Sequence, residues 1–332
     1  MRVLFLIQGY DRPSSRYRVL QYLPYLKQQG VKATVAVYPH GMRDHRNIYQ
    51  KMGDYDVVFI QRKRPHPLFL YFLLRRAKKL IYDFDDAVMY RSANAASPNS
   101  ATRESRFARI VKAVDHVIAG NTFLGEHARR YANHVTVIPT AIDIKKYTPK
   151  NYAKKKTKIT LGWIGSSSTL PYLEHIKGVF EALGERYKRL ELKVICDTFF
   201  DCEKIPVIKK IWSEKEEIAD LKSLDIGVMP LTDDLWSRGK CGLKILQYYG
   251  VGIPVVCTPV GVNRDVVKDG VNGFWAMTDE EWVEKLSLLI EDPALRRKMG
   301  LHGRGVVRES YSVQGCAPRF YTVLDEVIKK DA

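Results

Sequence analysis

The sequence predicts an α/β protein with two domains, each built on a doubly wound parallel sheet. A chain of 332 residues is long for one hydrophobic core and fits two domains of ordinary size. In both halves, short apolar runs alternate with segments of helical periodicity, which is typical of parallel strands joined by helices. The polar, basic and turn-rich stretch 149–157 separates the halves and has the composition of a linker. With 45% apolar residues, the chain can pack fully.

The first half opens with a strand, a glycine loop and a helix. Residues 3–7 are a continuous apolar run, Gly9 follows, and a serine then caps a helix predicted over residues 16–29. Arg16 and Arg18 would stand near the crevice at the carboxyl ends of the strands, although solvent-facing helix charges are an equally good interpretation. Further strands are predicted at 31–37, 56–60, 80–87 and 116–120, and helices at 67–80, 103–114 and up to residue 131.

Two interpretations remain open for residues 67–80, where seven apolar residues run directly into four basic ones. As a core helix of an α/β unit, the segment needs no special function. As an interfacial helix, it would place leucines and aromatic rings in the acyl boundary of a bilayer and its cations at the phosphates. Those cations are Arg75, Arg76, Lys78 and Lys79.

Three carboxylates, Asp83, Asp85 and Asp86, end the strand predicted within residues 80–87. At the carboxyl end of a strand they would point into the crevice between the domains. Carboxylate oxygens are ligands of hard cations such as Mg²⁺, so a metal site is one interpretation. A helix N-cap with solvated acids is another.

The second half repeats the pattern of strand, glycine loop and helix. An apolar run from residue 159 breaks into a glycine–serine loop before a helix that begins near Leu170. Gly165 permits close backbone approach, and the hydroxyls that follow it, from Ser166 onward, form an anion cradle together with the helix N-terminus. The next strand is predicted at 192–196, and Ser213 with Glu216 forms a capping box for another helix.

Residues 229–261 carry the main functional pattern of the chain. They predict a strand end, a polar loop, a helix over about 241–249, a glycine stop and a buried strand around 255–257, which together make a parallel strand–helix–strand unit. After them, a turn and short strand are predicted at 269–275, followed by helices at 279–290, 293–303 and 312–329.

The start of this central helix predicts a phosphate site. It lies beside Gly239, Lys240 and Gly242, and Lys244 stands one turn inside. The unpaired amides and the positive end of the helix dipole point the same way, and lysine is a sufficient partner for a phosphate as a point charge.

Three motifs carry a resemblance to a known family. Residues 242–256 resemble the donor-binding segment of retaining glycosyltransferases with the two-domain GT-B fold, in particular glycosyltransferase family 4 (group 1). Ala119-Gly-Asn-Thr followed by Val137-Ile-Pro-Thr-Ala-Ile-Asp is similar to the end of that family's first domain, and Asp269-Gly-Val-Asn-Gly-Phe is similar to a turn of its second. The resemblance therefore covers both halves.

The resemblance implies two Rossmann-like doubly wound domains with a C-terminal helix that crosses back to the first. The expected bounds are 1–148 for an acceptor-binding domain, 149–157 for the linker, 158–310 for the nucleotide-sugar-binding domain and 311–332 for the helix.

The resemblance also implies roles for particular residues. The donor would be bound by Gly165, Ser166, Trp212, Lys240, Gly242, Leu243, Lys244 and Gln247. The acceptor side would include Gly9, Arg16 and Asp83, and Asp85 stands where the family often has a histidine, so it is the predicted catalytic contact. Two glutamates of the family are replaced by Gly239 and Gln247, of which Gln247 can still hydrogen-bond a ribose diol.

The expected function is that of a retaining, hexosyltransferase-like and metal-independent enzyme of polysaccharide biosynthesis, with a nucleotide-diphosphate sugar as donor and no further cofactor. The acceptor hypothesis comes from charge: the net charge is +17, and residues 1–150 hold 26 basic against 11 acidic side chains. Such a field attracts an anionic bilayer or a polyanion, so a lipid-linked or membrane-surface glycan is the expected acceptor. A generally basic, solvated surface is the alternative.

Five cysteines without C-x-x-C spacing argue against a disulfide framework and a zinc site, and predict a cytoplasmic protein. No apolar run approaches the roughly 20 residues of a membrane span. Attachment to the inner face of the membrane would then be peripheral.

Three other functions remain open. A sugar-nucleotide epimerase of the same fold would act without an acceptor, and a non-catalytic sugar-nucleotide-binding subunit is favoured by the two missing glutamates. A nucleic-acid binder would use the basic first half, but the sequence has no helix-turn-helix, zinc finger or aromatic RNP-like stretch, so no nucleic-acid partner is expected.

Overall fold

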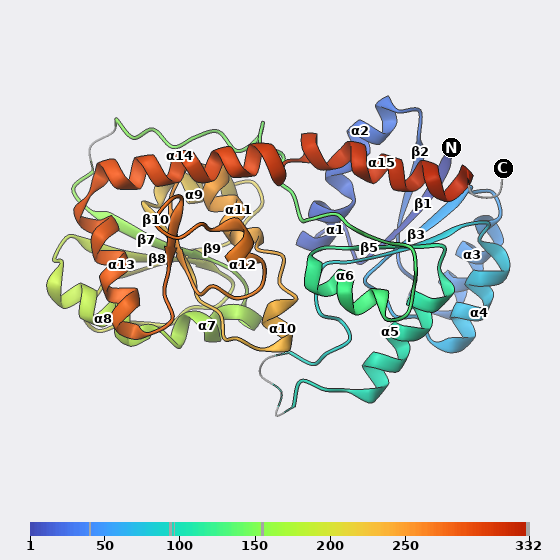
Figure 1. The fold of residues 1–332 in the computed structure, drawn as a ribbon, viewed down its shortest axis with the longest axis horizontal. Coiled ribbons are helices and arrows are strands. Elements are labelled where there is room, and N and C mark those ends of the chain that lie inside the picture. Colours follow the sequence, from blue (N-terminus) through green and yellow to red (C-terminus); the bar gives the residue numbers. More distant parts are fainter. Residues whose placement is uncertain (40, 93–94, 96, 154–155, 330–332) are drawn as a thin grey trace. The chain divides into compact units, whose positions relative to one another are not determined.

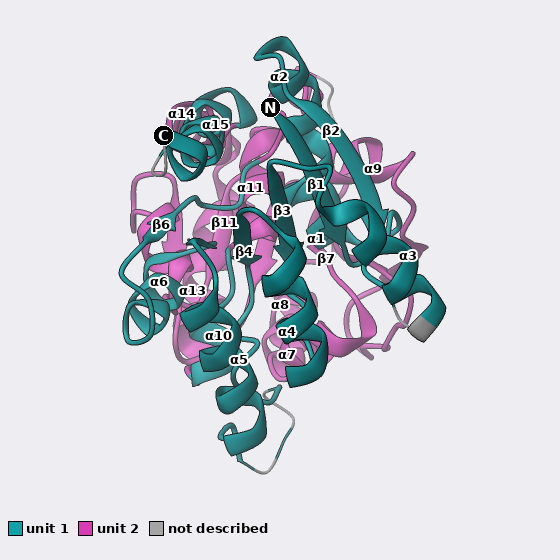
Figure 2. Ribbon diagram, turned by 90° about the vertical axis from the view of Figure 1, so that its right-hand side faces the viewer, with its two compact units in different colours: residues 1–141, 234–241, 313–332 teal, residues 142–233, 242–312 magenta. Residues whose placement is uncertain are grey.

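The computed structural model of the protein describes residues 1–39, 41–92, 95, 97–153 and 156–329. They form two compact units, coloured separately in Figure 2. Unit 1 contains residues 1–141, 234–241 and 313–332, and unit 2 contains residues 142–233 and 242–312. This division differs from the expected bounds in three places, because residues 142–148 and 311–312 belong to unit 2 and residues 234–241 belong to unit 1. Residues 154–155 of the expected linker and 330–332 of the expected last helix lie outside the described residues.

In its described part, unit 1 has a six-stranded sheet in the order β2-β1-β3-β4-β5-β6, and each of these pairings is parallel. The strands are β1 (Arg2–Ile7), β2 (Lys32–Val37), β3 (Val57–Gln61), β4 (Leu80–Phe84), β5 (His116–Ala119) and β6 (Val135–Val137). The connection from β2 returns across β1 to β3, so the strand order reverses between β1 and β3. At such a reversal, the carboxyl edge of a doubly wound sheet is where ligands bind.

Helices cover both faces of this sheet (Figure 1). They are α1 (Pro13–Arg18), η1 (Leu20–Tyr22), α2 (Leu23–Gln28), α3 (Met42–Met52), α4 (Pro67–Arg76), α5 (Ala101–Ala113), α6 (Thr122–Arg129), α10 (Leu235–Arg238) and α15 (Val313–Lys329). Alternate strand residues face opposite sides. On one side Phe59 packs on Phe320 of α15, with ring centroids 5.5 Å apart, and on the other Phe84 packs on Phe107 of α5, at 5.1 Å. The last helix thus completes the core of unit 1.

The structure divides the helix predicted over residues 16–29 into α1, η1 and α2. Pro24 lies in the first turn of α2, and a proline has no amide hydrogen to donate to the preceding turn. The segment is helical as predicted, but it is divided into three pieces, and Pro24 is incompatible with one continuous helix through this region.

Unit 2 also has a six-stranded sheet among its described residues, in the order β12-β11-β10-β7-β8-β9 and with parallel pairings. The strands are β7 (Ile159–Ile164), β8 (Leu190–Cys196), β9 (Val207–Ile211), β10 (Ile226–Met229), β11 (Val255–Cys257) and β12 (Gly273–Trp275). Counted from β7, this is the 3-2-1-4-5-6 order of nucleotide-binding Rossmann sheets, and the reversal lies between β7 and β10.

The helical segments of unit 2 follow the predicted alternation. They are η2 (Ser167–Thr169), α7 (Leu170–Glu174), α8 (Lys177–Arg186), α9 (Glu217–Ser223), α11 (Leu243–Gly250), α12 (Val262–Val266), α13 (Asp279–Glu291) and α14 (Pro293–Ser310). One core forms where Leu161 and Leu192 of the sheet pack with Leu183 of α8 and Leu286 of α13, all buried. The predicted doubly wound α/β architecture is confirmed in both units.

The short elements β6, β9, α10 and α12 were not predicted. Strand β9 is an edge strand in which charged Lys209 and Lys210 interrupt the apolar residues, and no residue of it is buried. Helices α10 and α12 have four and five residues, too few to display a helical period.

Helix α4 is only partly a core helix. Leu70 and Leu73 are buried, whereas the side chains between and beside them are among the most exposed large apolar residues of the protein. These are Leu68 (55% exposed), Tyr71 (51%), Phe72 (43%) and Leu74 (44%). Within the described ranges, no helix combines the length and the apolar character that a bilayer crossing requires.

Candidate functional site

Helix α11 begins at the carboxyl edge of the unit 2 sheet. Its N-cap, Gly242, has φ +67°, in the left-handed region where a β-carbon is unfavourable. The Tyr248 hydroxyl ties the helix to the sheet, because it accepts from the amide of Ile164 (3.2 Å) and donates to the carbonyl of Val228 (3.3 Å). Gly227 leaves room for this ring, since a β-carbon there would lie 2.4 Å from it. The first-turn amides of α11 are therefore held where a phosphate can meet them.

Two residues of unit 2 converge on the indole ring of Trp163 beside this helix start. Gly165 lies against Trp163, and a β-carbon at position 165 would be 2.2 Å from the ring. The Lys244 ammonium stands over the same ring, 5.0 Å from its centroid. The structure thus brings together two predicted donor residues, Gly165 and Lys244, through an aromatic side chain that the sequence reading did not single out.

The serine loop after Gly165 has an acidic partner. Ser167 donates from its amide to one oxygen of Asp197 (2.7 Å) and from its hydroxyl to the other (3.1 Å). Hydrogen bonds from Cys196 and from Ser167 lower the pKa of Asp197, so a carboxylate occupies the Ser167 donors. The neighbouring Ser166 hydroxyl is exposed and lies 2.9 Å from that of Ser168.

Gln247 belongs to a buried hydrogen-bond network of unit 2. Its amide lies 3.4 Å from the Tyr147 hydroxyl, which donates to Glu217 at 2.8 Å. The other oxygen of Glu217 accepts from the indole of Trp212 at 3.1 Å. Two predicted donor residues, Gln247 and Trp212, are therefore linked through Tyr147 and the buried acid Glu217. Sequence reading missed both linking residues, because neither lies in a recognised motif.

In unit 1, Asp83 forms a buried ion pair. The Arg18 guanidinium binds its carboxylate, with Nη2 2.5 Å from Oδ1, and also donates to the carbonyl of Ile138 at 2.7 Å. Arg18 and Asp83 are fully enclosed. In this structure Asp83 holds Arg18 rather than facing an acceptor, and the acceptor-side role predicted for it stays a prediction.

Asp85 and Asp86 surround a second arginine of unit 1. Arg62 Nη2 lies 2.6 Å from Asp86 Oδ2, and its Nε lies 3.4 Å from Asp85 Oδ1. Arg62 has φ +56°, the one positive φ outside glycine in the described part of the chain. Left-handed backbone costs a side-chain-bearing residue about 1–2 kcal/mol and collects at functional sites. The sequence analysis did not identify Arg62 as a candidate. Its positive φ, which only the structure shows, is what marks it as a candidate functional residue.

The pKa values of the neighbouring Asp85 and Asp86 carboxyl groups shift in opposite directions. Burial raises the pKa of Asp85, with the Asp86 charge adding to it and Arg62 opposing it. Burial also acts on Asp86, but Lys240 and Arg62 outweigh it and lower the pKa of that carboxyl. Oδ1 of Asp85 has no hydrogen-bond partner among the described residues. One carboxylate of the pair is therefore satisfied, and the other retains an acceptor atom.

Lys240 lies in unit 1, whereas Gly242 and Lys244 lie in unit 2. Its ammonium stands 3.5 Å from Asp86 Oδ1 and 4.8 Å from the centroid of the Trp236 ring. Gly239 contacts Ala87, and a β-carbon there would lie 2.6 Å from the Ala87 methyl and 2.9 Å from its amide. Any side chain at position 239, including the glutamate of the resembling family, would therefore collide with the backbone.

The remaining predicted residues are placed as follows. Gly9 is buried after β1, and Arg16 stacks on the Tyr17 ring, with its guanidinium carbon 4.4 Å from the centroid. Leu243 is the first residue of α11 and is half-buried. Asp83 within β4 and Asp85 and Asp86 after it form ion pairs with arginines and a lysine. No cluster suited to a metal ion occurs among the described residues.

Comparisons with known proteins support this reading of the fold. Residues 184–306 match the family model for glycosyl transferases group 1, and the segment 242–256 lies inside the match. No curated protein matches the chain in sequence.

Three solved structures resemble the whole chain. A glycosyltransferase from Rickettsia africae ESF-5 superposes with a TM-score of 0.74 at 13% identity, covering 99% of both chains. HepE of Anabaena, in complex with UDP and glucose, has a TM-score of 0.72 at 16% identity, covering 98% of this chain and 99% of that one. Sucrose-phosphate synthase of Thermosynechococcus elongatus has a TM-score of 0.70 at 14% identity, covering 98% of both chains. The chain therefore has the GT-B fold of these glycosyltransferases, as predicted.

Proposed function

We propose that the protein is a retaining glycosyltransferase that moves a sugar from a nucleotide-diphosphate sugar to an acceptor without a metal ion. The observation that carries the proposal is the start of α11, where Gly242 opens the helix and Lys244 stands beside it at the edge of a Rossmann-ordered sheet. A departing diphosphate gains negative charge in the transition state, and fixed amides with an ammonium group stabilise that charge. The retaining outcome rests on the resemblance of residues 242–256.

The base and ribose would lie toward the Gln247 network. The amide of Gln247 can hydrogen-bond a ribose diol, and Trp212 offers an aromatic face held in place by Glu217. Glu217 gives this site a buried carboxylate although both family glutamates are absent. HepE, which shares the fold, is solved with UDP-glucose, so UDP-sugars are the first donors to test.

Nucleotide binding gives the first prediction. In a thermal-shift panel of nucleotides and nucleotide sugars, the true donor is expected to raise the melting temperature, since a ligand at about 100 times its Kd stabilises the native state by roughly 2.7 kcal/mol. Lys244→Gln should weaken that ligand about tenfold, because one charge-assisted contact to the diphosphate is lost. The matched control is Lys222→Gln, an exchange in α9 of the same unit, which should leave the shift unchanged. Equal shifts in both variants would remove Lys244 from the site.

Time-resolved release of nucleoside diphosphate then separates the candidate functions. A transferase releases it in proportion to acceptor, an epimerase changes the donor sugar without acceptor, and a binding subunit gives the thermal shift with no release. The replaced glutamates are the one observation that favours the binding subunit.

A membrane-surface acceptor is the second part of the proposal. Exposed Leu68, Tyr71, Phe72 and Leu74 lie on α4, and exposed Arg75 and Arg76 end the same helix. Arg75 also stacks on Tyr71, 5.3 Å from the ring centroid, so apolar and cationic groups share one surface. Such a surface fits the boundary of an anionic bilayer, with rings among the acyl chains and guanidinium groups at the phosphates.

Vesicle binding tests this surface. Leu68→Ser with Phe72→Ser is expected to lower partitioning onto phosphatidylglycerol vesicles about tenfold or more, because two side chains lose apolar burial worth roughly 1.5–3 kcal/mol each when complete. The matched control, Ile208→Ser with Leu288→Ser, removes two apolar side chains of similar exposure from unit 2. Co-sedimentation that falls equally in both pairs, or in neither, would contradict docking through α4.

A further inference from the structure

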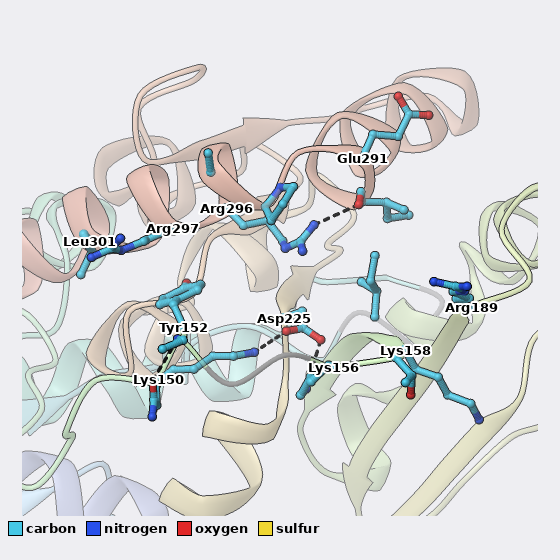
Figure 3. Close-up of a pocket in the computed structure, with 17 residues that line it drawn as sticks. Lys150, Tyr152, Lys156, Lys158, Arg189, Asp225, Glu291, Arg296, Arg297 and Leu301 are labelled. Atoms are coloured by element: carbon cyan, nitrogen blue, oxygen red, sulfur yellow. Dashed lines mark hydrogen bonds and ion pairs between the residues drawn. The ribbon is translucent and has the colours of Figure 1, made fainter.

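A second candidate site lies at the opposite edge of the unit 2 sheet. A cavity of about 970 Å³ opens there, and Figure 3 shows the side chains around it. Ile159, Arg189 and Asp225 line it at the amino ends of β7, β8 and β10. Since all these strands are parallel, their amino ends lie away from the carboxyl edge that holds Gly165 and the start of α11. The cavity is therefore separate from the proposed donor site.

The lining of the cavity is strongly cationic. Its described lining residues include six cations and two carboxylates, namely Lys150, Lys156, Lys158, Arg189, Arg296 and Arg297 against Asp225 and Glu291. The first turn of α14 also contributes Pro293 and Ala294, and the Asp292 carboxylate before it caps the helix by accepting from the Leu295 amide at 2.9 Å.

Both carboxylates already have partners. Asp225 binds the Lys150 ammonium and lies 3.1 Å from that of Lys156, and it accepts from the Thr160 amide at 2.9 Å. Glu291 lies 3.1 Å from the Arg186 guanidinium. Neither carboxylate forms a direct ion pair with Arg189, Arg296 or Arg297 in the described part of the chain, although the Asp225 charge acts on Arg296 from a distance.

Arg296 illustrates the excess of positive over negative charge in this cavity. Its Nη1 donates to the backbone carbonyls of Leu289 and Ile290, the latter at 3.0 Å, and no carboxylate pairs with it in the described part of the chain. Burial lowers the pKa of Arg296, which means that the protonated form is held at a cost in free energy. Attraction to the Asp225 and Asp292 charges opposes this lowering without offsetting it. A half-buried guanidinium group that forms no direct ion pair among the described residues is suited to an incoming anion.

We propose that this cavity binds a phosphate-bearing anion of pyrophosphate size or larger, at a site distinct from the donor site. Arginine presents planar, paired donors that match phosphate oxygens, and three arginines line one cavity of ligand size. An anion there would neutralise the excess charge and fix the segment before β7 against α14. The proposal does not depend on sugar transfer.

Calorimetric titration with inorganic pyrophosphate tests the site. Arg296→Gln is expected to weaken binding at least tenfold through loss of a charge-assisted contact. Because Arg296 also binds two carbonyls, the exposed pair Arg189→Gln with Arg297→Gln provides a second variant that leaves those bonds in place, with the same expected direction. The control pair, Lys204→Gln with Lys209→Gln, removes the same charge from exposed ion pairs outside the cavity and should change affinity less than about twofold.

A second experiment distinguishes a lipid headgroup from a free phosphate compound as the bound anion. Vesicles containing phosphatidic acid are titrated with the Leu68→Ser, Phe72→Ser protein, and displacement by pyrophosphate would assign the anion to a lipid headgroup. Pyrophosphate binding without vesicle binding would assign it to a free phosphate compound. The proposal is overturned if pyrophosphate affinity is unchanged in both arginine variants. It is also overturned if affinity is lost in Lys244→Gln instead, which would place the anion at α11.

Discussion

Asp85→Asn is expected to reduce sugar transfer at least a hundredfold while leaving the fold intact. Asp85 Oδ1 lies 3.4 Å from Arg62 Nε but has no hydrogen-bond partner in the described residues, so it keeps the capacity to accept a hydrogen bond from an acceptor hydroxyl. Positioned proton acceptors contribute about 10²–10⁴ to rate. Asp86→Asn is the matched comparison, because Asp86 pairs with Lys240 in addition to Arg62 and has hydrogen bonds to both. It should lower the melting temperature more than Asp85→Asn and the rate less.

The pH profile distinguishes a chemical role from a structural one. The pKa of Asp85 is raised by burial above its ordinary value of 3.8, and the role requires the ionised form. As pH falls through the raised pKa, Asp85 takes up a proton, so wild-type activity should decline on the acid side at a higher pH than a free aspartate would give. The residual activity of Asp85→Asn should lack this decline. A variant that keeps full activity, or an unchanged acid limb, would reject Asp85 as the catalytic contact.

Gly300→Ala is expected to cause the largest loss of stability among glycine-to-alanine exchanges in unit 2. A β-carbon at this position in α14 would lie 1.9 Å from the Gly252 carbonyl oxygen and 3.0 Å from the α-carbon of Ile253. These are backbone atoms of the segment that follows α11, so no side-chain rotation relieves the overlap. Overpacking of this kind costs roughly 3 kcal/mol, which in a domain of this size corresponds to a decrease in melting temperature of about 6–12 °C.

Gly305→Ala provides the control within the same helix. Apart from the adjoining turns of α14, no atom of the described residues lies within 4 Å of a β-carbon at position 305, and alanine is the better helix former. This exchange should raise stability by about 0.5–1 kcal/mol. Thermal unfolding followed by circular dichroism measures both variants, and shifts of the same sign and size would show that α14 does not pack against the 252–253 segment as described.

The sequence determined much of the site's local framework. The order of apolar runs and glycine loops predicted the two doubly wound sheets, and the pattern around residues 226–257 placed β10, α11 and β11 within two residues of their observed bounds. These features depend on residues three or four positions apart, or on a single glycine that adopts a left-handed backbone conformation. Local preferences of this kind can be recognised in the sequence alone.

The tertiary structure decided which side chains meet. Lys240 and Lys244 are four positions apart, yet they belong to different units, and Lys240 pairs with Asp86, 154 residues away. Gly239 has no side chain because Ala87 fills the space. The link from Gln247 through Tyr147 to Glu217 joins segments 100 and 70 residues apart, and the cationic cavity draws on five segments. Contacts between residues so far apart in the sequence depend on how the elements pack, and no local sequence pattern encodes that packing. The sequence therefore determined the helices and strands, whereas the tertiary structure determined which charged side chains pair.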